Sequence, residues 1–163
     1  MTPDPAVADR PPSRTGPEPA FLPLQARPEV VRQARRFAAE AVSGHPYDPY
    51  DIALLASELA TNAVRAATAL HPWPDDIWPV GVEVTVTDRY VHLAVSDPDP
   101  EPLSARQTGG LLAENGRGLV IIDQHALAWW PTYTEHGKTV HVIVPASGVI
   151  LTAAELAEIR EAR

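Results

Sequence analysis

The sequence predicts an α+β fold in which helices pack on one face of a mixed, mainly antiparallel sheet. Three observations predict it. Apolar residues recur with a helical period over residues 28–43 and 51–70. Apolar residues also make up 45% of the 163 residues, which is enough for one domain with a sizeable core. Finally, two pairs of alternating segments read as β-hairpins, at 80–87 with 90–96 and at 127–133 with 138–144.

The chain divides into three regions. Residues 1–20 contain six prolines and almost no large apolar residue, so we expect a disordered, proline-rich tail. The folded domain is expected over residues 21–147, beginning with a short edge strand. Residues 148–163 are expected to form a helical extension, because Thr152 and Glu155 have the spacing of a capping box.

Prolines and a change of periodicity mark the ends of the helices. Pro28 suits the first turn of the first helix, and Pro46 and Pro49 separate that helix from the second. Residues 97–115 are rich in proline, glycine and aspartate and have little periodicity, so we expect a long loop or lid there. A helical pattern returns at residues 116–125.

The helix predicted over residues 51–70 carries a polar pair beside its apolar face. Glu58 and Asn62 lie one turn apart. A carboxylate can accept a proton, and a carboxamide oxygen is a hard ligand that suits Mg²⁺. The ordinary alternative is a solvated glutamate at the helix edge and an asparagine that pairs with neighbouring backbone. The apolar face of this helix consists of Ile52, Leu55, Leu59, Ala63, Ala66 and Leu70.

Two segments further along the chain have features of a nucleotide site. Asp97 directly follows the apolar segment 91–96, at the rim of the predicted sheet, where its carboxylate can accept a hydrogen bond from an exocyclic amine such as that of adenine. An aspartate at this place is also a common turn former. The helix predicted from residue 116 begins in a glycine-containing loop, and backbone amides at a helix start favour phosphate. The residues at this start are Gly116, Arg117 and Gly118.

A fourth segment, Gly137-Lys138-Thr139, has the last residues of a phosphate-binding P-loop. The glycine that this motif requires five residues upstream is Thr132 in this chain. We therefore reject the P-loop and keep the segment as the start of the last strand.

Composition excludes several classes of function. The chain has no cysteine, which excludes disulfides, thiolate metal sites and a cysteine nucleophile. A formal net charge of −8 argues against direct binding of nucleic acid. No apolar stretch approaches the length of a membrane span or resembles a signal peptide, so we expect a cytoplasmic protein without membrane contact. The six histidines lack the spacing of a metal site.

The order and spacing of these segments resemble the GHKL ATPase superfamily over about residues 21–145. Within it, the chain is most similar to the small serine kinases and anti-sigma factors of bacterial stress and sporulation control, above all to their actinobacterial relatives. The helix segment 58–63 resembles the N box, and Asp97 resembles the aspartate of the first glycine box. The run 116–119 resembles the second glycine box, and Thr139 resembles the late threonine of the adenine pocket. The resemblance implies a Bergerat-type two-layer sandwich.

The resemblance also implies a role for each matching residue. Asn62 would hold Mg²⁺ at the phosphates of ATP, and Glu58 would orient or deprotonate the attacking hydroxyl. Asp97 would bind the adenine amine, with support from Thr139. The phosphates would meet the backbone amides of Gly116, Arg117 and Gly118, with the guanidinium of Arg117 available to offset their charge.

The activity that the resemblance implies is that of an ATP-dependent protein serine/threonine kinase in transcriptional control. Such a kinase phosphorylates or sequesters a regulatory protein, either an anti-sigma antagonist or a sigma factor, and the first helix could support a homodimer. A stand-alone ATPase ranks lower, because such ATPases usually carry a second domain that supplies a lysine.

One departure from the family pattern favours a different function. After Asp97 the chain reads Pro98-Asp99-Pro100-Glu101-Pro102, where the family usually has a small residue two positions on. Prolines remove backbone donors, and two extra carboxylates repel a triphosphate unless they face solvent. The alternative is therefore a catalytically inactive adaptor that senses nucleotide, or ignores it, and binds a sigma factor, an antagonist or another regulator.

Overall fold

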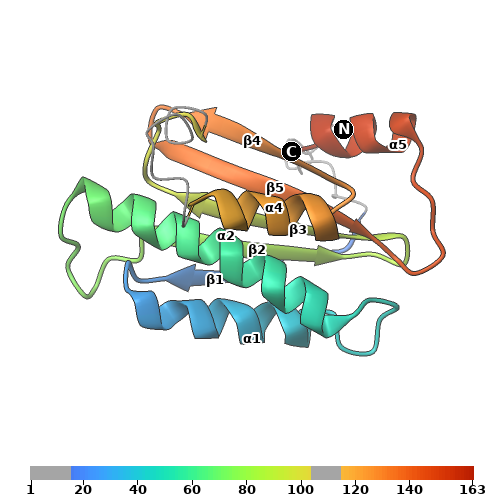
Figure 1. Cartoon of the computed structure of the whole chain (residues 1–163), viewed down its shortest axis with the longest axis horizontal. Helices are drawn as coiled ribbons and strands as arrows, with labels where there is room; N and C mark the ends of the chain where they lie inside the picture. The colour runs from blue at the N-terminus through green and yellow to red at the C-terminus, as the bar shows by residue number, and fades with distance from the viewer. Residues whose placement is uncertain (1–15, 104–114) are drawn as a thin grey trace, which may run out of the picture.

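The computed structural model describes residues 16–103 and 115–163, and it shows a five-stranded sheet with helices on both faces (Figure 1). The strands are β1 (Ala20–Leu24), β2 (Val80–Val86), β3 (Tyr90–Asp97), β4 (Ala128–Thr134) and β5 (Gly137–Pro145). The helices are α1 (Val31–Ala41), α2 (Pro49–Leu70), α4 (Asn115–His125) and α5 (Ala153–Glu161), with a short 3-10 turn, η1 (Pro28–Val30), before α1. These elements confirm the predicted α+β class and the order of its helices and hairpins.

The strands lie in the order β1-β2-β3-β5-β4. All four pairings between neighbouring strands are antiparallel, so the expectation of a mixed sheet was wrong for the part of the chain described here. The two hairpins, β2–β3 and β4–β5, meet in the pairing of β3 with β5. In that pairing Asp97 at the end of β3 lies opposite Lys138 at the start of β5.

The main hydrophobic core lies between the sheet and the layer formed by α1, α2 and α4 (Figure 1). Alternate residues of the central strands, such as Leu93 and Val142, point into this core and are fully buried. Leu55 and Leu59 of α2 meet them from the helix side. Helix α2 begins at Pro49, with Asp48 as its N-cap, as both residue types favour at a helix start.

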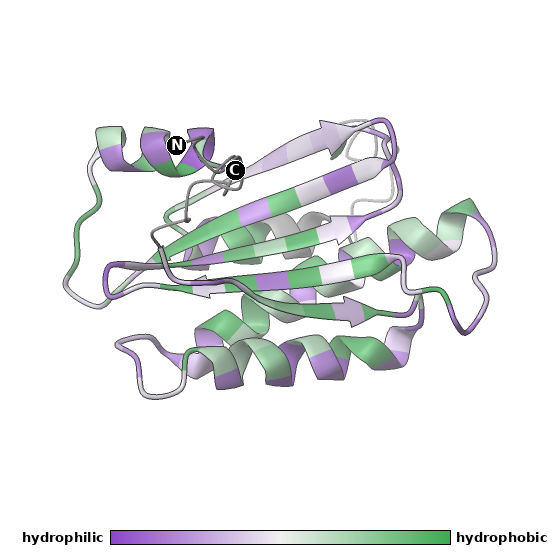
Figure 2. Cartoon of the chain, turned by 180° about the vertical axis from the view of Figure 1, so that it is seen from behind, coloured by the Kyte–Doolittle hydropathy of each residue, from purple (hydrophilic) through white to green (hydrophobic). Residues whose placement is uncertain are grey.

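Helix α5 packs on the opposite face of the sheet, so the expectation that all helices share one face was wrong. A second, smaller cluster joins Trp130 and Ile143 of the sheet to Leu151 and Ile159. Figure 2 shows this rear face, with α5 near the β4 edge of the sheet. The predicted capping box is present: Glu155 donates its amide to the Thr152 hydroxyl, and its carboxylate accepts the Thr152 amide.

The disordered tail (residues 1–20) and the lid (97–115) fall largely on residues 1–15 and 104–114, which lie outside the described residues. Leu70, predicted on the apolar face of α2, is 43% exposed because it is the last residue of that helix. Among the helices described, none combines the length and the apolarity that crossing a bilayer requires.

Candidate functional site

Glu58 and Asn62 lie in the middle of α2, at the border between its buried face and solvent. Both side chains are half-buried. Their neighbours Ser57 and Thr61 use their hydroxyls within the helix, on the carbonyl oxygens of Ala53 (2.8 Å) and Ser57 (2.7 Å). Glu58 and Asn62 make no such hydrogen bond to another described residue. The alternative in which Asn62 pairs with neighbouring backbone is therefore not what the helix contains, and among the described residues neither polar group has a hydrogen-bond partner.

Helix α4 runs antiparallel to α2, which brings its N-terminus to the level of this pair (Figure 1). His125 in the last turn of α4 lies 3.4 Å (Nδ1 to Oδ1) from Asp51 in the first turn of α2. A rise of about 12 Å along each helix from this contact reaches Arg117 on α4 and Leu59 on α2. The first-turn amides of α4 have no partner within the helix and are suited to an anion. These amides belong to residues that include Gly116, Arg117 and Gly118.

Asp97 ends β3 on the helix-covered face of the sheet, at the same end of the molecule as the C-terminal half of α2 (Figure 1). It is buried, with 7% of its surface exposed. The ammonium group of Lys138 donates to its Oδ1 over 3.1 Å, and the backbone amide of Asp99 donates to the same oxygen over 2.9 Å. Burial raises the pKa of Asp97 above its usual value, while the Asp99 amide and the Lys138 charge oppose that rise.

Gly137 allows β5 to approach β3 at this point. A Cβ atom at position 137 would overlap the carbonyl oxygen of Asp97, which is a backbone atom and has no freedom to turn aside. Position 137 therefore requires glycine if Lys138 is to lie against Asp97.

The proline-rich segment after Asp97 folds back on itself. Asp99, 3% exposed, turns inward: its carbonyl oxygen accepts from Lys138 over 3.1 Å, and its Oδ2 lies 3.6 Å from the same ammonium group. Its Oδ1 accepts the amide of Glu101 over 3.0 Å. The amides of Asp99 and Glu101 are thus both used, and Pro98 and Pro100 have none to offer. We expected the extra carboxylates to repel a triphosphate unless they faced solvent, and Asp99 instead faces a cation.

Thr139, predicted to support Asp97, lies on the other face of the sheet. Successive residues of a strand point to opposite faces, and Val140 and Val142 belong to the core under the helices. Lys138 shares their face, whereas Thr139 shares the rear face with Ser96, its partner on β3. The residue beside Asp97 is therefore Lys138. The sequence carried one signal for it that we had not used: it is the only lysine in the chain.

The segments thus lie on neighbouring elements, since α2 contacts both α4 and β3, and β3 pairs with β5. Acceptors lie on α2 and β3, and the first-turn amides of α4 have no partner within that helix. Within the described part of the chain, no group of three or more histidine, aspartate or glutamate side chains is placed to hold a metal ion by itself. A divalent ion here would need a ligand that brings its own oxygens, such as a triphosphate, with Asn62 supplying one more. Residues 24–144 match the family of the histidine kinase-like ATPase domain. No curated protein matches the chain.

Proposed function

Because the chain belongs to the family of histidine kinase-like ATPase domains, which bind ATP, we propose that it is a protein serine/threonine kinase of the anti-sigma-factor type. In this proposal it phosphorylates or sequesters a regulatory protein, an anti-sigma antagonist or a sigma factor. The observation that carries the proposal is the pair Glu58 and Asn62. Their side chains are half-buried, one turn apart, without a partner among the described residues, and level with the start of α4.

Each of these groups has a separate task in phosphoryl transfer. Asn62 would supply a carboxamide oxygen to Mg²⁺, and the first-turn amides of α4 would hold the phosphates. A magnesium ion bound there offsets charge on the phosphate oxygens. Glu58 lies one turn from Asn62 and would orient the attacking serine hydroxyl or accept its proton. Asp97 would accept a hydrogen bond from the adenine amine.

The first test asks whether Asn62, and not its neighbour on the helix, is needed for Mg²⁺-dependent binding of ATP. Asn62→Ala should abolish Mg²⁺-dependent binding of ATP in titration calorimetry, because in this proposal the Asn62 carboxamide is the protein's ligand to Mg²⁺. Thr61→Ala is the matched control, since the Thr61 hydroxyl is used on the Ser57 carbonyl within the helix. Equal ATP affinity for the wild type and Asn62→Ala would refute the assignment.

The second test concerns chemistry rather than binding. Glu58→Gln keeps the size of the side chain and removes its basicity, so ATP affinity should stay the same. Transfer of label from γ-labelled ATP to serine of a partner protein should slow by about 10²–10⁴-fold, the usual contribution of a general base. Unchanged transfer would show that Glu58 is not the base.

The inactive adaptor is the second candidate, and the segment 98–101 favours it. That segment has no backbone amide left for a phosphate, because two of its residues are prolines and the other two amides are used internally. The same calorimetry discriminates between the two functions. A wild-type chain that binds a regulatory protein but takes up no ATP would be an adaptor.

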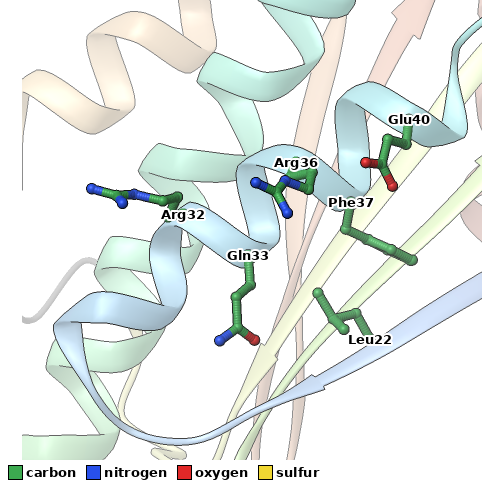
Figure 3. Close-up of a pocket in the computed structure, with 6 residues that line it drawn as sticks. All are labelled: Leu22, Arg32, Gln33, Arg36, Phe37 and Glu40. Atoms are coloured by element: carbon green, nitrogen blue, oxygen red, sulfur yellow. The ribbon is translucent and has the colours of Figure 1, made fainter.

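For the partner we propose the groove between α1 and β1. Figure 3 shows Phe37 pointing toward Leu22 at its floor, while Arg32 and Arg36 extend from α1 at its rim. Both arginines are exposed, so the groove favours an acidic partner. A second copy that met this groove through the same face would bring the same arginines against them. Arg36→Glu should weaken partner binding. If it instead changes the molecular mass in light scattering, α1 serves a homodimer.

A further inference from the structure

The chain's only lysine is buried, while all its other basic residues are arginines. Lys138 is 5% exposed. Its ammonium group has three donors, and three oxygens surround it: Asp97 Oδ1 at 3.1 Å, the Asp99 carbonyl at 3.1 Å and Asp99 Oδ2 at 3.6 Å. A buried charge persists only when it is paired and hydrogen-bonded, and this one is.

The two carboxylate oxygens of Asp97 are used differently. Oδ1 accepts from both Lys138 and the Asp99 amide. Oδ2 accepts no hydrogen bond from any residue in the described ranges. The carboxylate is therefore fixed through one oxygen, and the other remains for a ligand at the end of the sheet.

We propose that Lys138 is a positioning residue for nucleobase selection. It keeps Asp97 charged and oriented, so that the Asp97 carboxylate accepts a hydrogen bond from an exocyclic amine of the base and disfavours a base with a ring carbonyl in that place. This inference rests on the proposed ATP-binding site. Lys138 acts through Asp97 and need not touch the base.

The physical reason is that the positive charge of Lys138 offsets the negative charges of two carboxylates beside it. The ammonium group of Lys138 lies close to both buried carboxylates, Asp97 (3.1 Å) and Asp99 (3.6 Å). Burial already raises the pKa of Asp97, and loss of the adjacent cation raises it further. A protonated carboxyl group donates as well as accepts, so it tolerates a carbonyl where a carboxylate accepts only an amine.

ATP and inosine triphosphate make the test, because they differ at this position of the base: adenine carries an amine and hypoxanthine a carbonyl. Lys138→Met keeps the length of the side chain and removes the charge. We expect the ratio of ATP to inosine triphosphate affinity, measured by calorimetry with Mg²⁺, to fall about tenfold or more, the range of one charge-assisted hydrogen bond. Lys138→Arg restores a cation and should recover part of the ratio. If both affinities fall by the same factor, or neither changes, Lys138 has only a structural role and the inference is wrong.

Removal of one partner of a buried ion pair can unfold a domain, so a measurement on the wild type is needed as well. Isotope-labelled lysine gives a single side-chain NMR signal in this chain. Adenosine alone should shift that signal, and Mg²⁺ with inorganic tripolyphosphate should not. A signal that stays in place while calorimetry reports ATP binding overturns the inference and leaves the proposed function intact. Failure of the wild type to bind ATP at all overturns both.

Discussion

Lowering the pH from about 7.5 to about 5 should reduce the free energy of unfolding by about 4 kcal/mol, through two histidines on the rear face of the sheet. His92 on β3 and His141 on β5 are both buried, and their rings stack with centroids 5.2 Å apart. His92 Nε2 and His141 Nδ1 share one hydrogen bond of 3.0 Å. The ring of Trp130 lies near both, with its centroid 5.1 Å from that of His141 and 6.2 Å from that of His92.

The magnitude follows from the pKa of each ring. Burial, and then the charge of Arg163, lower the pKa of His92 to about 3 and that of His141 to about 4. The unfolded chain takes up these protons near pH 6.5, whereas the folded chain remains neutral. Stability is therefore complete above pH 6.5 and is lost as the pH falls below it. At pH 5 each histidine removes about 2 kcal/mol, from about 1.4 kcal/mol per pH unit.

Urea unfolding followed by tryptophan fluorescence at the two pH values measures this loss. His92→Phe keeps an aromatic ring in the stack and removes one titrating group, so it should lose about half of the pH dependence. Asp97, whose raised pKa acts in the opposite direction, is common to both proteins and cancels in the comparison. His136→Gln is the control, because the side chain of His136 is 86% exposed, at the turn between β4 and β5. The reasoning fails if the wild type is equally stable at both pH values, or if His92→Phe keeps the full dependence.

Two further predictions concern single contacts. Gly137→Ala should lower both thermal stability and ATP affinity, because the new Cβ overlaps the Asp97 carbonyl oxygen; Gly148→Ala is the control, since position 148 has open space but a positive φ of 75°. Nucleotide binding should change in the first variant only, and calorimetry reports it. Thr152→Ala removes the capping box of α5 and should reduce the free energy of unfolding by about 1 kcal/mol in urea, whereas ATP affinity should not change.

Periodicity was sufficient to predict the elements of the fold, but not the partners of the site residues. The alternation of apolar residues predicted the strand β5 at the right place. It did not predict whether Lys138 or Thr139 lies beside Asp97, because these neighbouring residues point to opposite faces of the sheet. That choice depends on the pairing of β3 with β5, which aligns Asp97 with Lys138. Sequence reasoning treats strands singly and does not contain this register. The same limit applies to α5, because its capping box predicts a helix without predicting which face of the sheet it covers.

In the proposed site, the segment after Asp97 would divide nucleotide recognition between two parts of the fold. In the range 98–101 two residues lack an amide hydrogen, and the amides of Asp99 and Glu101 are bound to carboxylates. This segment can therefore shape the surroundings of Asp97 but has no donor for a phosphate. In the proposed function, the amides at the start of α4 would then hold the phosphates, and Asn62 on α2 would hold Mg²⁺. It follows that substitutions around Lys138 should change which base is accepted, whereas Asn62→Ala should change the dependence of binding on Mg²⁺. A single variant that altered both would show that the base and phosphate sites are coupled through the proline-rich segment.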